Sequence, residues 1–99
     1  MRFQLREYTI EEGRLDDFVG EWRELVLPLR VSMGFSVLGP WIERGASRFV
    51  WIVGYDGDIE AADAAYYASG ERAAMRSDPA RLVVEARTVW LEAPEATRR

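Results

Sequence analysis

The chain contains no cysteine, no histidine and no lysine, and all 13 of its basic residues are arginines. Without cysteine it can form no disulfide, thiolate nucleophile or zinc–cysteine site. Without histidine it can have neither a Ser-His-Asp triad nor a histidine-ligated metal, and the absence of lysine excludes a Schiff base. Any chemistry must therefore come from carboxylates, arginines, hydroxyl groups and the four tyrosines.

Long apolar runs and an excess of positive charge are also missing. No run approaches the roughly 20 residues that a membrane-spanning helix needs, and the N-terminal residues lack the apolar stretch of a signal peptide. The net charge is -4, with acidic and basic residues interspersed, which argues against binding to nucleic-acid phosphates. We expect a cytoplasmic protein with no membrane span and no nucleic-acid partner.

Metal and cofactor sites are not indicated. No pair of carboxylates has a spacing that singles it out as a metal site or an acid–base couple. The segment Asp56-Gly57-Asp58 is better explained as a turn that leads into a helix cap. We therefore expect no metal and no cofactor.

With 99 residues, the chain can bury the core of one modest domain, which we expect over residues 1–93, followed by a polar tail over 94–99. Strand formers and alternating patterns predict four strands, over residues 3–10, 35–42, 49–55 and 82–91. The order of these strands relative to the helices determines the fold.

Apolar residues at helical spacing predict a first helix from Leu15 to Leu29, in which Pro28 should cause a kink or break. Glu21 and Glu24 of this helix are expected on a solvated face. Asp58 should cap a second helix over 59–69, with Gly70 as its C-terminal cap and one further turn over 71–75.

The resulting order is strand, helix, strand, strand, helix, strand. It predicts an α+β, ferredoxin-like βαββαβ fold with one four-stranded antiparallel sheet, in which the first and third strands are central.

Both faces of the predicted sheet carry apolar side chains. On the third strand, Trp51 and Tyr55 lie on one side, and Val50 and Ile52 lie on the other. Two helices cover only one face of such a sheet, so we expect a homodimer that pairs through the sheet face. The alternative is a monomer whose own long strands and C-terminal tail fold over to cover the second face.

The chain resembles the NIPSNAP family. The residues that carry the resemblance run in order along nearly the whole chain: Leu5-Arg6-Glu7-Tyr8-Thr9-Ile10-Glu11-Glu12-Gly13, Leu15-Asp16-Asp17-Phe18, Trp22-Arg23, Leu27-Pro28-Leu29-Arg30, Gly34-Phe35, Leu38-Gly39-Pro40-Trp41 and Arg48-Phe49-Val50-Trp51-Ile52-Val53-Gly54-Tyr55-Asp56. The resemblance implies a dimeric α/β barrel and no firmly established reaction. The wider superfamily includes cofactor-free monooxygenases, isomerases and haem proteins, but a haem held by a proximal histidine is incompatible with this sequence.

Arg6 and Tyr8 share one face of a central strand and are the first candidates for a ligand site. A guanidinium beside a phenol could hold and polarise a carboxylate, carbonyl or enolate. The structural alternative is that Arg6 pairs with Glu85 or Glu7 while Tyr8 packs against its neighbours.

Aromatic residues are the second group of candidates. Trp51 and Tyr55, joined by Trp41, could line a pocket for a flat apolar ligand, or could be core or dimer interface. Tyr66 and Tyr67 point about 100° apart on a helix, so at most one should face the sheet and donate a hydrogen bond to a ligand. Both could instead be purely structural.

The leading functional hypothesis is a NIPSNAP-like homodimer of unassigned biochemical role that binds a small, partly apolar organic molecule. One alternative is a cofactor-independent monooxygenase or isomerase of the dimeric α/β-barrel superfamily, in which the substrate supplies its own reactivity. The other is a structural or protein-interaction module without a pocket. These hypotheses include an enzyme as well as proteins without catalytic activity, and the sequence alone does not choose between them.

Overall fold

A computed structural model describes residues 1–94 of the chain, so most of the tail expected over 94–99 lies outside the described residues. Four strands form one sheet in the order β2-β3-β1-β4, and every neighbouring pair is antiparallel. The strands are β1 (Arg2–Ile10), β2 (Ser36–Glu43), β3 (Arg48–Tyr55) and β4 (Val83–Leu91). The predicted ferredoxin-like order, with the first and third strands central, is confirmed.

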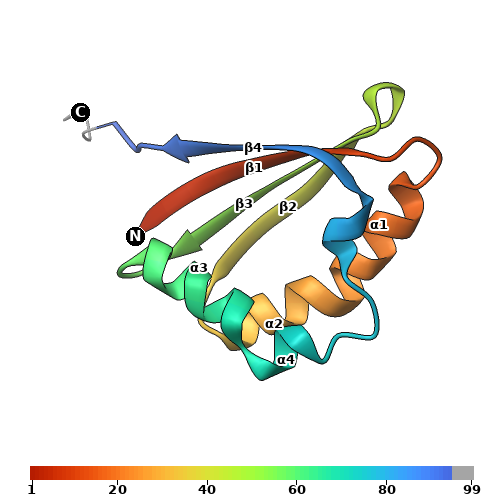
Figure 1. Cartoon of the computed structure of the whole chain (residues 1–99). Helices are drawn as coiled ribbons and strands as arrows, with labels where there is room; N and C mark the ends of the chain where they lie inside the picture. The colour runs from red at the N-terminus through yellow and green to blue at the C-terminus, as the bar shows by residue number, and fades with distance from the viewer. Residues whose placement is uncertain (95–99) are drawn as a thin grey trace.

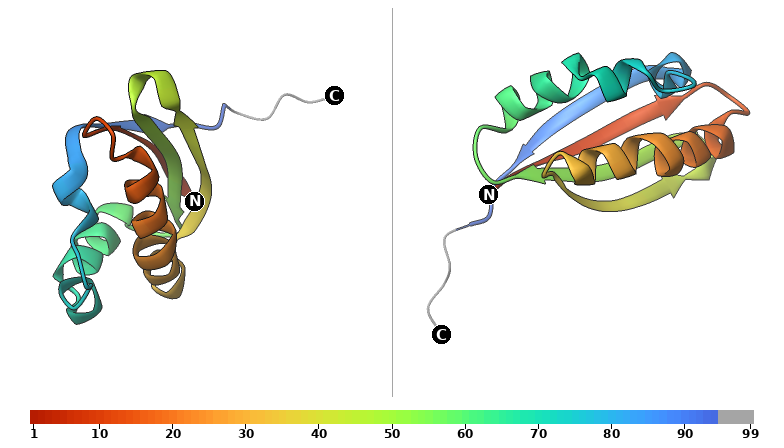
Figure 2. Two further views of the ribbon diagram at one scale, coloured as in Figure 1. Left: turned by 90° about the vertical axis from the view of Figure 1, so that its right-hand side faces the viewer. Right: turned by 90° about the horizontal axis from the view of Figure 1, so that it is seen from below.

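The helices all cover the same face of this sheet (Figure 1). One continuous helical segment is made of α1 (Leu15–Glu21), the π-helical turn η1 (Trp22–Val26) and α2 (Leu27–Ser32). The second contains α3 (Ile59–Ala68) and α4 (Gly70–Ala73), and the 3-10 turn η3 (Pro79–Leu82) leads into β4. Figure 2 shows the two helical segments running beside each other beneath the sheet, whose other face is left uncovered. None of the helices within residues 1–94 has the length and hydrophobicity that crossing a lipid bilayer requires.

The break expected at Pro28 does not occur. Proline lacks the amide hydrogen that an α-helix interior needs, but Pro28 stands in the first turn of α2, directly after the π-helical turn. There the Leu27 amide donates to the Trp22 carbonyl, five residues back, so the helix changes its hydrogen-bond spacing just before the proline. The helical segment therefore continues to Ser32.

The end of α3 also differs from the prediction. Asp58 caps α3 as expected, because its side chain accepts from the Ala61 amide at 3.1 Å. Gly70, however, is the first residue of α4 and not a C-terminal cap. Ser69 separates the two helices, and its hydroxyl accepts from the Arg72 amide at 3.0 Å, which is the usual role of serine at a helix start.

The core lies between the sheet and the helices and is centred on Phe49 of β3. The Phe49 ring is fully buried and lies 4.9 Å from the Phe18 ring, 5.2 Å from the Trp22 ring and 6.1 Å from the Tyr8 ring. Such aromatic contacts add to the large apolar area that these rings bury. They fix the first helical segment against β1 and β3.

The uncovered face carries an apolar row across all four strands. Backbone pairing places Leu38, Ile52, Leu5 and Val89 side by side. Leu38 is 52% exposed, although it is a large aliphatic side chain. The prediction of a sheet with apolar residues on both faces is therefore confirmed.

The prediction that Glu21 lies on a solvated face is wrong. Its carboxylate accepts two hydrogen bonds of 2.7 Å from Arg81 and one of 2.9 Å from Ser77, and its side chain is only 12% exposed. The hydrogen bond from Arg81, followed by that from Ser77, lowers the pKa of Glu21 from 4.5 to about 2. This contact ties α1 to the turn before β4.

We expect Glu21→Gln to lower the free energy of unfolding by about 1 to 2 kcal/mol at pH 7, less than the pKa change alone suggests because Arg81 is partly solvated. A carboxylate with a lowered pKa stabilises the fold above pH 4.5, and this contribution is lost as the pH falls towards 2. Urea denaturation between pH 3 and 7 should therefore show the wild-type advantage shrinking with acidity. Glu24→Gln, which removes an exposed ion pair with Arg76, is the control and should cost less than about 0.5 kcal/mol. A Glu21→Gln difference that does not change with pH would contradict this assignment.

Candidate functional site

A cavity of about 360 Å³ lies between the helices and the sheet. Its wall is mainly aromatic, with Tyr8, Trp22, Trp51, Tyr66 and Tyr67 among the lining residues. Its open side is at β4, where the exposed residues Val84, Glu85 and Ala86 contribute. A volume of this size, with apolar walls and few polar groups, is typical of a site for a small organic ligand.

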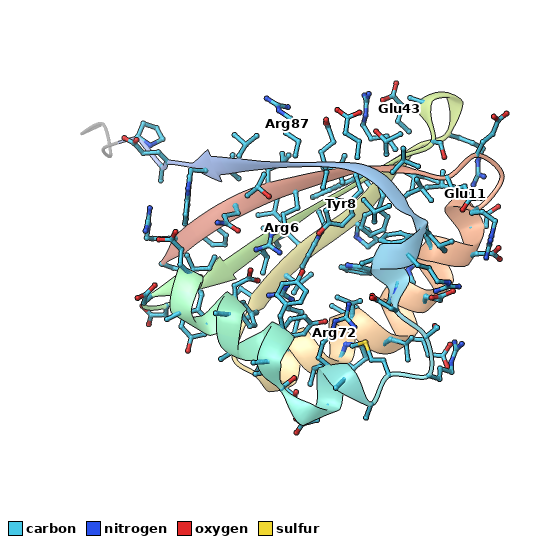
Figure 3. All side chains as sticks on the ribbon, in the orientation of Figure 1. Arg6, Tyr8, Glu11, Glu43, Arg72 and Arg87 are labelled. Atoms are coloured by element: carbon cyan, nitrogen blue, oxygen red, sulfur yellow. The ribbon has the colours of Figure 1, made fainter. Side chains whose placement is uncertain are left out.

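Strand alternation and helical spacing together place the wall residues. Tyr8 points to the helix side of β1 (Figure 3). Trp51 pairs with Arg6 and points to the same side of the sheet from β3. The turn η1 and α2 present Trp22, Val26 and Arg30 to the same cavity at intervals of four residues. From the other helical segment come Tyr66, Tyr67 and Arg72.

Arg30 is the buried cation of the cavity wall and is only 1% exposed. Its Nη1 atom donates to Oδ1 of Asp63 at 2.7 Å. Its guanidinium carbon lies 3.7 Å from the centre of the Tyr66 ring and 4.7 Å from that of Phe35, so the charge is also stabilised by the faces of aromatic rings. A buried arginine in this setting is held in one orientation.

Arg6 lies behind the wall and shares the same carboxylate. Its Nη2 atom donates to Oδ1 of Asp63 at 3.1 Å and to Oε1 of Gln4 at 2.7 Å. The expected pairing with Glu7 or Glu85 is wrong, because within residues 1–94 Arg6 forms an ion pair with Asp63 alone. Glu7 points to the uncovered face of the sheet, where its nearest cations are Arg48 and Arg87 at 3.9 Å.

Arg72 adds a third guanidinium at the cavity. It forms an ion pair of 2.7 Å with Asp78, and its side chain is 14% exposed. The guanidinium carbons of Arg30 and Arg72 lie 5.3 and 5.7 Å from the centre of the Tyr67 ring. The two cations of the wall therefore converge on one aromatic side chain.

Several donors in the wall are buried without an acceptor. Among residues 1–94, no group accepts a hydrogen bond from the indole nitrogens of Trp22 and Trp51, the Tyr66 hydroxyl, or the Nε atoms of Arg30 and Arg72. A buried donor without a partner costs about 1 to 3 kcal/mol. The wall is thus rich in donors and poor in acceptors.

Tyr8 is a protonated phenol beside this group of donors. Burial, and then the neighbouring Tyr67 phenol, raise the pKa of Tyr8, and the positive charge of Arg6 opposes the rise without cancelling it. Burial likewise raises the pKa of Tyr66, against the effect of Arg30 and Arg72. Both phenols remain hydrogen-bond donors at neutral pH.

The structure brings together most, but not all, of the residues expected at the site. Tyr8, Trp51 and Tyr66 line the cavity, and Arg6 lies behind it. Tyr67 lines it as well, although at most one of Tyr66 and Tyr67 was expected to face the sheet. Tyr55 does not line the cavity and instead packs on Phe35, with ring centres 5.2 Å apart.

Trp41 lies on the uncovered face and not with Trp51. The chain advances by three positions from Leu38 to Trp41 in β2, where the paired strand β3 advances by only two, from Ile52 to Val50. This bulge reverses the alternation, so that Trp41 faces away from the helices and is 54% exposed. The prediction that Trp41 joins Trp51 in lining a pocket is therefore wrong.

Trp22, Arg30 and Arg72 were not expected at the site. The sequence did contain a signal for Arg30, since it follows Trp22 and Val26 at four-residue intervals on the apolar stripe of the first helix. A charge on such a stripe must find partners when it is buried. For Arg72 we find no comparable signal.

We expect Asp63→Asn to lower the free energy of unfolding by at least about 2 kcal/mol, because it leaves Arg6 and Arg30 without their shared counter-charge. Asp16→Asn is the matched control, since its ion pair with Arg44 is exposed and should contribute less than about 1 kcal/mol. Urea denaturation at neutral pH measures both. Equal losses for the two variants would show that the shared carboxylate has no special role.

Comparison with solved structures places this fold among known proteins. An uncharacterised NIPSNAP domain protein from Burkholderia xenovorans matches with a TM-score of 0.81 and 17% identity, over 99% of this chain and 100% of that one. A NIPSNAP family protein from Agrobacterium tumefaciens matches with a TM-score of 0.83 and 15% identity, over 97% and 88%. A structure described as an antibiotic biosynthesis monooxygenase matches with a TM-score of 0.70 and 17% identity, over 94% and 98%.

No protein-family model and no curated protein matches the sequence itself. The structural matches have low sequence identity and therefore establish a shared fold. The chain has the ferredoxin-like α+β fold found in NIPSNAP proteins, over nearly its whole length.

Proposed function

We propose that this protein binds a small, partly apolar organic molecule in the cavity between the helices and the sheet. The observation that carries the proposal is the cavity itself, about 360 Å³ in volume and walled by six aromatic side chains and two arginines. A module that served only to contact other proteins would have no need of such a cavity. The cavity therefore favours a binding protein over a structural module.

We further propose that the protein is NIPSNAP-like in biochemical role as well as in fold. Support comes from the ordered sequence resemblance and from the structural likeness over nearly the whole chain. Because the Burkholderia protein is itself described as uncharacterised, the family assignment names no substrate. The ligand has to be identified from the chemistry of the cavity.

A cofactor-independent monooxygenase or isomerase is the second candidate. It is favoured by the structural likeness to an antibiotic biosynthesis monooxygenase and by Tyr8, a protonated phenol at the cavity. Such a phenol could donate a hydrogen bond to a developing enolate oxygen. Incubating a bound ligand with the protein in air and analysing it by mass spectrometry separates the two candidates, because a binding protein returns the ligand unchanged.

The apolar row on the uncovered face supports a homodimer that pairs sheet to sheet. The Phe3 ring adds to this apolar row. It packs closely over Gly54, where an added methyl carbon would lie 2.5 Å from the ring. Trp41 extends the apolar surface at its edge. A second copy of the same chain would bury this surface on both partners at once.

We expect light scattering at micromolar concentration to give twice the chain mass of 11.4 kDa. Ile52→Glu, in the centre of the apolar row, should give a monomer, because it places a charge in the buried contact. Val31→Glu makes the same chemical change at an exposed position of α2 and should leave the dimer intact. A wild-type mass of 11.4 kDa would contradict the dimer.

Binding in the cavity can be tested by filling its open side. In a thermal-shift screen of mono- and bicyclic metabolites, a ligand at about ten times its Kd should raise the Tm by about 5 °C or more. Ala86→Trp should abolish this shift, because Ala86 lines the cavity. Thr88→Trp is the control, since Thr88 lies two residues along β4 and outside the lining.

Loss of the shift in Ala86→Trp alone is the expected result. A shift that persists in both variants would place the ligand elsewhere. A screen in which no compound stabilises the wild-type protein would contradict the proposed function.

A further inference from the structure

We propose that the ligand is a flat aromatic monocarboxylate, whose carboxylate is bound between Arg30 and Arg72. The inference rests on the proposed function and specifies the chemistry of the ligand. It is carried by the balance of charge around the cavity and by the buried donors in its wall. Neither feature is needed for binding a neutral apolar molecule.

Counted by their ion pairs, the arginines around the cavity carry more positive charge than their carboxylate partners carry negative charge. Arg6, Arg30 and Arg72 have two carboxylate partners among residues 1–94, and one of these, Asp63, is shared. Arg6 and Arg30 both donate to the same oxygen, Oδ1. One unit of positive charge is therefore left without a counter-charge in a region of low dielectric.

The remaining carboxylate of the lining does not offset this charge. Glu85 lies on the exposed edge strand β4, at the open side of the cavity, and among the described residues it forms no ion pair with Arg6, Arg30 or Arg72. A monoanion would balance the excess of one positive charge. A phosphate dianion would carry one negative charge more than this excess. A cation would be repelled by two guanidinium groups.

The donors of the wall need an acceptor. The Nε atoms of Arg30 and Arg72 and the Tyr66 hydroxyl are buried without a partner among the described residues, and both guanidiniums lie within 5.7 Å of the Tyr67 ring centre. A carboxylate has two oxygens that accept only, and it forms charge-assisted hydrogen bonds with guanidinium groups. A small adjustment of side chains on binding would bring these donors to the carboxylate.

The shape of the site accounts for the aromatic part of the ligand. Tyr8, Trp22 and Trp51 form the side of the cavity towards the sheet and first helical segment. Figure 3 shows Tyr8 and Arg72 both in the space between the sheet and the helices, while Arg87 and Glu43 lie on the other side of the sheet. A flat ring stacked within these aromatic walls would leave its carboxylate at the arginines.

Calorimetric titration with three naphthalene probes tests the inference. The probes are 2-naphthoate, the neutral amide 2-naphthamide, and the dianionic 2-naphthyl phosphate. We expect naphthoate to bind wild-type protein at least tenfold more tightly than naphthamide, because the amide has the same shape and no charge. The phosphate should bind no more tightly than naphthoate.

Arg72→Gln should remove most of the preference for naphthoate over naphthamide. This variant is preferred to a change at Arg30, whose side chain is in the core. Arg76→Gln is the matched control, because Arg76 is an exposed arginine four residues further along the chain, pairs with Glu24 and does not line the cavity. It should keep the full preference.

The possible outcomes separate this inference from the proposed function. Equal affinity for naphthoate and naphthamide, or a preference that Arg72→Gln leaves unchanged, would overturn the inference and leave the proposed function standing. Tighter binding of the phosphate would overturn the choice of a monocarboxylate. Absence of binding by all three probes at millimolar concentration would count against both the inference and the proposed function.

Discussion

A single carboxylate oxygen, Oδ1 of Asp63, connects the three elements on which the candidate site depends. It accepts from Arg6 on β1 and from Arg30 on α2, and Asp63 itself belongs to α3. Removing two guanidiniums from water is costly unless they are paired, so this contact constrains how both helical segments lie on the sheet. The position of Arg30 in the cavity wall follows from it.

The two faces of the sheet carry different kinds of side chain. The helix face combines an aromatic core with buried cations and encloses the cavity. The uncovered face has an apolar row in its middle and the ion pairs of Arg48 with Glu7 and Glu43 towards one end. Since successive residues of a strand point to opposite faces, one sequence of alternating side chains encodes both the proposed ligand site and the surface that we assign to a second copy.

The order of strands and helices could be predicted because it depends on short-range periodicity, as could the placement of Arg6 and Tyr8 on one face. The predictions that failed concern features that depend on hydrogen bonding and tertiary context. The effect of Pro28 was misjudged because a π-helical turn precedes it, and Trp41 was misplaced because a bulge in β2 reverses the alternation. Arg30 was missed because its aromatic and acidic partners come from distant parts of the chain.

The central claim is that buried arginines orient an anionic ligand in an aromatic cavity. A crystal structure of the protein with 2-naphthoate tests it most directly. We predict the naphthalene ring between Tyr8, Trp22 and Trp51, with the carboxylate within hydrogen-bond distance of Arg30 and Arg72. A naphthoate whose carboxylate points out past β4 into solvent, or which binds on the uncovered face of the sheet, would contradict the account.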